Sequence, residues 1–170
     1  MPTKVTLEQI TIRTELKAGD IGYVIYMHGH FYGREHGFGI LFETYVAQGL
    51  YEFYQHYNPE RERAWVCEHE GRIIGFILLV DRGTAAQLRY FVIHPNYRGI
   101  GLGKLLMELF MEFLNEKGYT SCYLMTTRGL LAAAALYDRY GFKLTQEIPS
   151  TAFGKPVIEQ RYELNLSKKS

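Results

Sequence analysis

The chain has 170 residues, of which 47% are apolar and 22% charged, and its net charge is +1 at pH 7. This length and composition suit one globular domain with a core of its own, which we expect to span residues 1–170. The near-neutral charge, with no long run of one sign, argues against a protein that binds nucleic acid or a membrane surface.

The first nine residues are polar, and no window has the length of a membrane span or the pattern of a signal peptide, so a cytoplasmic location is expected. Residues 10–16 alternate apolar and polar side chains, as a half-buried strand does. Ile21, Val24, Ile25 and His28 then follow helical spacing, which puts His28 on the apolar stripe. The pattern alone favours a core histidine over a catalytic one.

Three glycines interrupt the helical pattern between Gly33 and Gly39, which predicts a mobile loop. Helical spacing resumes at Phe42 and ends at Asn58-Pro59. The two helices and the loop could form a wall over a substrate site, or their polar side chains could simply be solvated. The polar residues concerned are His28, Tyr32, His36 and Glu43.

Three runs rich in β-branched and aromatic residues follow, at 64–67, 73–80 and 86–93. Turn signals at Glu70-Gly71 and at 81–83 separate them. This spacing predicts an antiparallel meander that leads directly into a glycine-rich turn.

That turn reads Arg-Gly-Ile-Gly-Leu-Gly-Lys from Arg98 to Lys104, and apolar residues then recur at helical spacing until Gly118. A glycine-rich turn that feeds a helix N-terminus leaves several N–H groups unpaired, and the helix dipole adds positive potential. The local chemistry is that of a pyrophosphate site. The residues expected to hold it are Arg98, Gly99, Ile100, Gly101, Leu102, Gly103 and Lys104.

Two common phosphate-binding motifs fit this turn poorly. A P-loop needs Ser or Thr after its lysine, whereas Leu105 follows Lys104, and the dinucleotide fingerprint spaces its glycines differently. The glycine cluster alone would also suit a tight strand-to-helix turn with no ligand.

The remaining elements complete an alternating pattern. Residues 122–125 should form a strand parallel to the one that precedes the turn, because a helix separates the two. A helix at 130–140 and strands at 143–148 and 157–164 follow, with a loop at 149–156. Cys67 and Cys122 lie in apolar runs and suit buried thiols.

The Arg-x-x-Gly-x-Gly form, set between a strand and an amphipathic helix, resembles the acetyl-CoA motif of the GNAT superfamily of acyltransferases. The resemblance implies an α/β fold with a mixed sheet of about seven strands. The sheet would be antiparallel except for one parallel pair that splays to hold acetyl-CoA, and about four helices would flank it.

A second motif, Leu136-Tyr137-Asp138-Arg139-Tyr140-Gly141-Phe142, is similar to the family's Leu-Tyr-x-x-x-Gly-Phe segment. The matching Tyr137 would be the general acid. Segments at 28–32, 42–43, 86–89 and 153–155 further resemble acetyltransferase domains fused behind MarR-type DNA-binding domains. In that case this chain would be the catalytic module alone.

Two positions depart from the family pattern. Leu130 stands where many relatives carry a cofactor-binding asparagine, and Met125 stands where some carry a glutamate base. We therefore expect the acid to be Tyr137, whereas Glu43 and His28 are the candidate bases.

The resemblance also implies how acetyl-CoA would be held. The backbone of Phe91, Val92 and Ile93 would pair with its pantetheine arm, as an added strand does. The Val92 N–H would polarise the thioester carbonyl.

The expected activity is transfer of an acetyl group from acetyl-CoA to a primary amine of a small molecule or amino acid by direct attack. A protein N-terminal or lysine acetyltransferase, a non-catalytic acyl-CoA-binding module and a nucleotide-binding domain are the alternatives. No metal is expected, because the histidines lack a convincing ligand set. A homodimer is possible, since dimers are common in the family.

Overall fold

The computed structural model describes residues 3–167. Its strands are β1 (Thr11–Arg13), β2 (Arg63–His69), β3 (Arg72–Arg82), β4 (Ala85–Ile93), β5 (Ser121–Thr127), β6 (Lys143–Ser150) and β7 (Val157–Asn165). Its α-helices are α1 (Asp20–His36), α2 (Ile40–Gln55), α3 (Leu102–Glu116) and α4 (Leu131–Arg139), with short 3-10 turns η1 (Leu7–Gln9) and η2 (Pro95–Tyr97). The predicted order of strands and α-helices is confirmed.

All seven strands form one sheet in the order β1-β2-β3-β4-β5-β7-β6. Among the strands of residues 3–167, only β4 and β5 run parallel, and the other pairs are antiparallel. The expected mixed sheet with one parallel pair is therefore confirmed.

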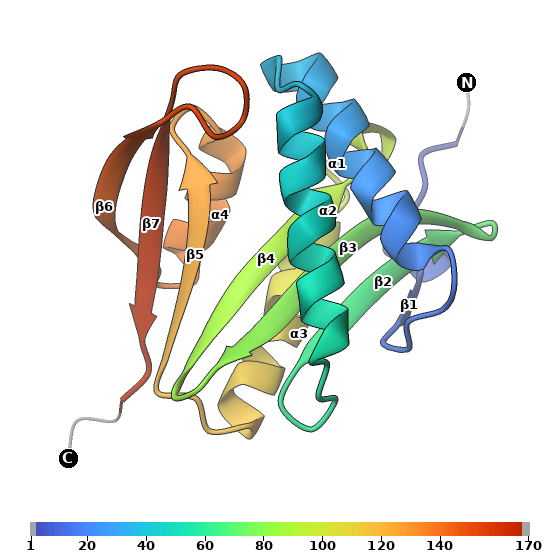
Figure 1. Ribbon diagram of the computed structural model, residues 1–170. Helices are drawn as coiled ribbons and strands as arrows, with labels where there is room; N and C mark the ends of the chain where they lie inside the picture. The colour runs from blue at the N-terminus through green and yellow to red at the C-terminus, as the bar shows by residue number, and fades with distance from the viewer. Residues whose placement is uncertain (1–2, 168–170) are drawn as a thin grey trace.

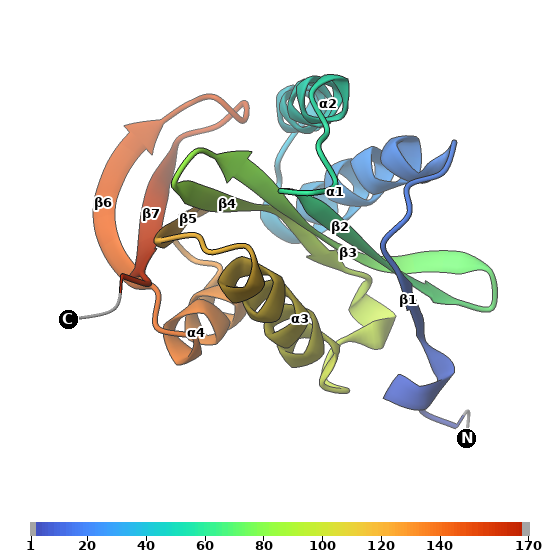
Figure 2. The same cartoon turned by 90° about the horizontal axis from the view of Figure 1, so that it is seen from below.

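Helices cover both faces of this sheet (Figure 2). Leu102, Leu106, Phe110 and Phe113 of α3 lie at helical spacing, and each is at most 2% exposed in a core shared with α4. A second core joins α1 and α2 to the other face. The buried meander β2–β4 packs on both sides, which explains its nearly continuous apolar runs.

The parallel pair separates along its length. Pairing of β4 with β5 ends at Leu88 and Leu124, although both strands continue beyond these residues. Figure 1 shows the two strands diverging toward the end where α1 and α2 meet. Beside the gap, Tyr90 and Phe91 of β4 lie opposite one residue of β3, and Tyr90 adopts a φ of 57°. This bulge bends β4 away from β5.

The predicted loop between Gly33 and Gly39 is wrong in extent, because α1 continues to His36 and only residues 37–39 connect it to α2. Gly33 stays helical, and its carbonyl accepts the N–H of Gly37, which closes the helix with a φ of 70°. The extra helical turn carries His36 toward the gap in the sheet, on the same helix as Tyr32.

Within residues 3–167, no helix combines the length and apolar character needed to cross a membrane. Cys67 and Cys122 are free thiols, and burial raises the pKa of each to about 12. Both are therefore protonated and unreactive at neutral pH.

Candidate functional site

A cavity of about 510 Å³ lies at the gap between β4 and β5. Its walls come from α1, α2, β4, β5, the glycine-rich turn and α4. Because these elements cover opposite faces of the sheet, the cavity reaches from one face to the other. Such a passage needs the parallel pair to separate.

The glycine-rich turn forms one end of the cavity. Arg98, Gly99, Gly101, Leu102 and Gly103 line it, whereas Ile100 packs against the core and Lys104 lies beside Glu108. Gly99 and Gly101 have φ values of 75° and 91°, which only glycine adopts readily. Among the described residues, the N–H groups from Gly99 to Lys104 have no backbone acceptor, as a pyrophosphate site requires.

Arg98 already has a partner on α1. Its Nη1 and Nη2 each donate to a carboxylate oxygen of Glu35 at 2.8 Å, and its Nε donates to the Ile93 carbonyl at 3.3 Å. The hydrogen bond from Arg98 lowers the pKa of Glu35. This ion pair joins the end of α1 to the glycine-rich turn.

The hydrogen bonds of β4 alternate between its two neighbours. The His94 N–H donates to the Ile74 carbonyl at 2.8 Å, and Val92 lies two residues earlier in the same register. The Val92 N–H therefore faces β3, whereas the N–H groups of Ile93, and of Phe91 beside the bulge, face the gap. All three residues line the cavity, but this alternation does not support the predicted role of the Val92 N–H.

Tyr137 lines the cavity from α4 and is only 6% exposed. Burial raises the pKa of Tyr137 well above its ordinary value, and the nearby Tyr32 adds to the shift. The phenol is therefore protonated at neutral pH and can donate a hydrogen bond.

His28 lines the opposite side of the cavity and is 3% exposed. Its Nδ1 lies 2.8 Å from the Val24 carbonyl, which can only accept, so Nδ1 carries the proton and Nε2 keeps a lone pair. Burial lowers the pKa of His28 to about 4. The imidazole is neutral at pH 7, and both the core and the cavity interpretations of His28 describe it correctly.

Glu43 lies elsewhere. Its carboxylate packs against α1 at Gly29, where an added Cβ would overlap the Glu43 Oε1. Glu43 is not among the residues that line the cavity. Its position favours a structural role between α1 and α2 over the predicted role as a base.

The loop between β6 and β7 closes over the outer side of the cavity. Phe153 packs against Phe42 and Tyr45 of α2, with ring centroids 5.1 and 5.2 Å apart, and Lys155 donates to the His36 carbonyl. A second hollow of about 840 Å³ shares lining residues such as Glu35 and His36 with the cavity. This hollow forms a mouth beside the bridged loops, through which the cavity opens to the surface.

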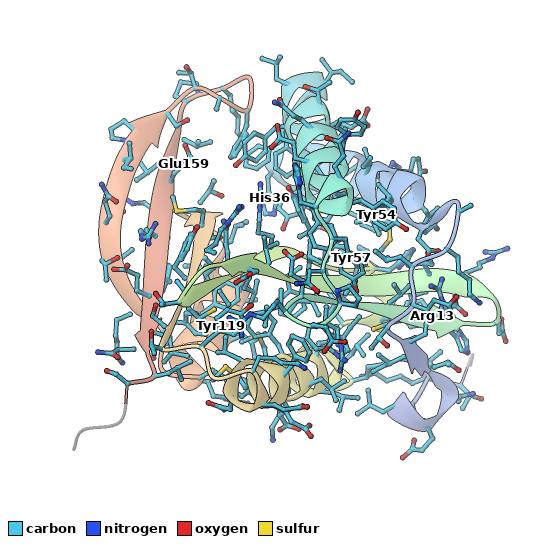
Figure 3. All side chains as sticks on the ribbon, turned by 60° about the horizontal axis from the view of Figure 1, so that its bottom comes forward. Arg13, His36, Tyr54, Tyr57, Tyr119 and Glu159 are labelled. Atoms are coloured by element: carbon cyan, nitrogen blue, oxygen red, sulfur yellow. The ribbon has the colours of Figure 1, made fainter. Side chains whose placement is uncertain are left out.

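Sequence reasoning missed several lining residues. Glu159 reaches the cavity from β7, and Figure 3 labels it together with His36 of α1. At the start of α4 the cavity is also lined by Gly129, Leu131, Ala132 and Ala133, where the alanine run was the available signal. Leu130, which stands where many relatives carry a cofactor-binding asparagine, lines it as well. Within residues 3–167, no three His, Cys, Asp or Glu side chains are grouped as metal ligands.

Comparison with known proteins places this geometry in a family. Residues 31–142 match the model described as the acetyltransferase (GNAT) family. The chain is 36% identical over 104 residues to the Escherichia coli protein called uncharacterized N-acetyltransferase YjgM, which covers 59% of this chain and 62% of that protein. It is 35% identical over 81 residues to N-acetylaspartate synthetase of Xenopus tropicalis, covering 46% of this chain and 30% of that one. The chain thus spans less than two thirds of either relative.

Solved structures share the whole fold at low identity. The ribosomal-protein-S18-alanine N-acetyltransferase from Escherichia coli superposes with a TM-score of 0.70 at 21% identity, covering 95% of this chain and 96% of that one. Spermidine N-acetyltransferase from Vibrio cholerae, solved with CoA and spermine, gives 0.69 at 20% identity, covering 95% and 98%. A GNAT family acetyltransferase from Elizabethkingia anophelis with acetyl-CoA bound gives 0.65 at 14% identity, covering 94% and 99%. These matches confirm the predicted fold.

Proposed function

Because this chain belongs to the acetyltransferase (GNAT) family, we propose that it transfers an acetyl group from acetyl-CoA to a primary amine of a small molecule. One observation carries the proposal. The glycine-rich turn, the gap beside β4 and the buried Tyr137 open into a single cavity.

The described residues fit acetyl-CoA, the acyl donor of this family. The unpaired N–H groups from Gly99 to Lys104 and the guanidinium of Arg98 would hold its pyrophosphate. The edge of β4 from Phe91 to Ile93 has no strand partner on the β5 side and would pair with the pantetheine arm. When bound there, acetyl-CoA supplies an activated acetyl group.

Backbone donors on β4 would stabilise the negative charge that develops on the carbonyl oxygen. The N–H groups of Phe91 and Ile93 face the gap, so we assign this role to them in place of Val92. The side chain of Val92, which is 4% exposed, still shapes the cavity wall.

Tyr137 would donate a hydrogen bond to the departing sulfur. A thiol with a pKa near 8.5 is a stronger acid than an unperturbed tyrosine with a pKa near 10, and burial raises the pKa of Tyr137 further. Full proton transfer to the free thiolate would therefore be uphill. Tyr137 stabilises the leaving group while keeping its proton.

His28 suits an orienting role better than that of a strong base. An α-amine has a pKa near 8, so moving its proton to an imidazole of pKa about 4 would cost roughly 5 kcal/mol. The Nε2 lone pair can instead accept an N–H of an amine that is already neutral. The ammonium form would lose its proton to water through the mouth of the cavity. A second proton leaves the nitrogen as the C–N bond forms and the C–S bond breaks, and it balances the charge of the departing thiolate.

The closed loops favour a small acceptor over a peptide. A peptide needs an open groove between the α1–α2 connection and the β6–β7 loop, but the contacts of Phe153 and Lys155 bridge the two.

Thiol release from acetyl-CoA tests the proposal, with amino acids, polyamines and short peptides as acceptors. We expect release with a small amine and an acetylated product by mass spectrometry, and none with peptides. Phe153→Ala should allow larger amines to react, because it removes the central ring of the loop contact. Wild-type acetylation of peptides but not of small amines would contradict the proposal.

Binding of acetyl-CoA with no acceptor turned over would instead indicate a non-catalytic module. The likeness to domains fused to MarR-type regulators, and the single domain over residues 1–170, stay predictions.

A further inference from the structure

The charged side chains around the cavity are unevenly paired. Four Asp, Glu, Lys or Arg residues line it, namely Glu35, Arg89, Arg98 and Glu159. Glu35 and Arg98 neutralise one another. Within residues 3–167, Arg89 and Glu159 form no ion pair and no side-chain hydrogen bond. The cavity thus offers one unpaired cation and one unpaired anion.

Arg89 is positioned where β4 leaves β5, one residue after the last paired position. Its guanidinium lies over the ring of Tyr90, with 4.5 Å from Cζ to the centroid, and 6.0 Å from the centroid of Tyr45. These rings hold the flat guanidinium in place without neutralising its charge.

A second donor beside Arg89 also has no acceptor. A Cβ added at Gly49 would overlap the Tyr90 hydroxyl and lie 3.0 Å from the Arg89 Nη2, so both groups surround this glycine. The Tyr90 hydroxyl is the one fully buried polar side-chain atom in residues 3–167 that has no hydrogen-bond partner. Because that hydroxyl is buried against Gly49, the unpaired guanidinium of Arg89 is the group here that favours an anion.

The walls next to Arg89 are apolar. Tyr45 packs against Phe153 at 5.2 Å, and Phe153 contacts Phe42 and Phe38 at 5.1 and 5.5 Å. This row of rings, all of which line the cavity, can bury an apolar or aromatic group attached close to the anion.

We propose that Arg89 binds the carboxylate of the acceptor and that the acceptor is an amino acid with an apolar or aromatic side chain. A carboxylate accepts two parallel hydrogen bonds from a guanidinium, whereas a carboxamide has only one oxygen to offer. The inference rests on the proposed acetyl transfer and names the substrate class of the same site.

The test compares the standard amino acids with their carboxamides as acceptors, in the wild type and in Arg89→Gln. We expect the wild type to prefer an apolar or aromatic amino acid over its amide by about 10- to 100-fold in kcat/KM, the range for a charge-assisted hydrogen bond. Arg89→Gln should remove this preference, because it lowers kcat/KM for the amino acid far more than for its amide. Arg89→Lys should restore part of it, because lysine keeps the charge but not the planar fork.

Arg72→Gln is the matched control, because Arg72 is exposed at the start of β3, away from the cavity, and its loss changes the net charge equally. It should keep the full preference. The proposal is overturned if amides react as well as amino acids in the wild type, or if Arg89→Gln lowers both equally.

Binding separates this inference from the proposed function. If no acceptor is acetylated, thermal unfolding with CoA present is compared with and without each amino acid. The carboxylate site is supported, although acetyl transfer fails, if amino acids stabilise the wild type and their amides do not. This stabilisation should disappear in Arg89→Gln. Equal stabilisation by both, or none, overturns the carboxylate site as well.

Discussion

At the scale of single residues, burial sets the chemistry of the two side chains that face each other across the cavity. Tyr137 keeps its proton and His28 stays neutral, with a proton on Nδ1 alone, because the cavity walls disfavour the charged form of each. The pair thus provides a hydrogen-bond donor on the α4 side and an acceptor on the α1 side. Neither state could be derived from the sequence, since both depend on packing between distant segments.

Replacing Tyr137 by phenylalanine should lower kcat by about 10- to 100-fold, because the departing sulfur loses a hydrogen-bond donor. The shape of the cavity is kept, so the stabilisation by acetyl-CoA should not change. Steady-state kinetics and thermal unfolding measure the two effects. Tyr162→Phe is the control, because its ring lies 6.2 Å from that of Tyr137 but does not line the cavity. An unchanged kcat in Tyr137→Phe would remove this residue from the mechanism.

His28 should make the fold sensitive to acid. The pKa of His28 is about 4 in the folded state and near 6.5 in the unfolded state. Between pH 4 and pH 6.5 the imidazole is therefore protonated in the unfolded chain but neutral in the folded one. The free energy of unfolding therefore falls by up to roughly 3 kcal/mol as the pH drops from 6.5 to 4.

Urea unfolding across this pH range measures that loss. His28→Phe should flatten the slope in part, because His36 and His94 also have lowered pKa values. His56→Phe, at an exposed position after α2, should leave the slope as it is. A slope identical in wild type and His28→Phe would show that His28 is not buried in its neutral form.

At the scale of elements, the ion pair between Glu35 and Arg98 connects α1 with the glycine-rich turn. A pyrophosphate would meet a guanidinium whose charge Glu35 already neutralises. Glu35→Gln should therefore tighten CoA binding by about two- to fivefold at low salt, with the gain shrinking as salt rises. Calorimetric titration measures it.

Glu112→Gln makes the same change of charge on the exposed surface of α3 and should have little effect. Weaker binding in Glu35→Gln would mean that Glu35 holds Arg98 in its binding position instead of competing for it.

Helix α1, which carries Glu35, also shows where sequence patterns were insufficient. Glycines at 33, 37 and 39 predicted a loop, yet only Gly37 and Gly39 lie outside the helices. Tertiary contacts of Tyr32 with Phe38 and Phe42, at 6.0 and 4.9 Å, stabilise the last turn of α1 despite its glycine. The contact that places Glu35 beside Arg98 spans 63 residues and leaves no local signal.

At the scale of the whole molecule, the order of strands and α-helices, the parallel pair and the glycine-rich turn followed from periodicity and motifs. These features rest on local patterns and on the handedness of strand-helix-strand units. Other features depend on the register between strands and could not be predicted from local patterns. They are the bulge at Tyr90, the direction of the β4 hydrogen bonds and the position of Glu159 at the cavity. A homodimer remains a prediction that analytical ultracentrifugation can test.

The central claim is that the gap between β4 and β5 is an acetyl-CoA site, and thermal unfolding tests it most directly. At a hundred times its dissociation constant, a ligand stabilises by about 2.7 kcal/mol, or roughly 5 to 10 °C for a chain of this size. We predict this shift with acetyl-CoA and none with ATP or NAD at the same concentration. No shift with acetyl-CoA, or a larger one with either nucleotide, would contradict the assignment of the cavity and the function derived from it.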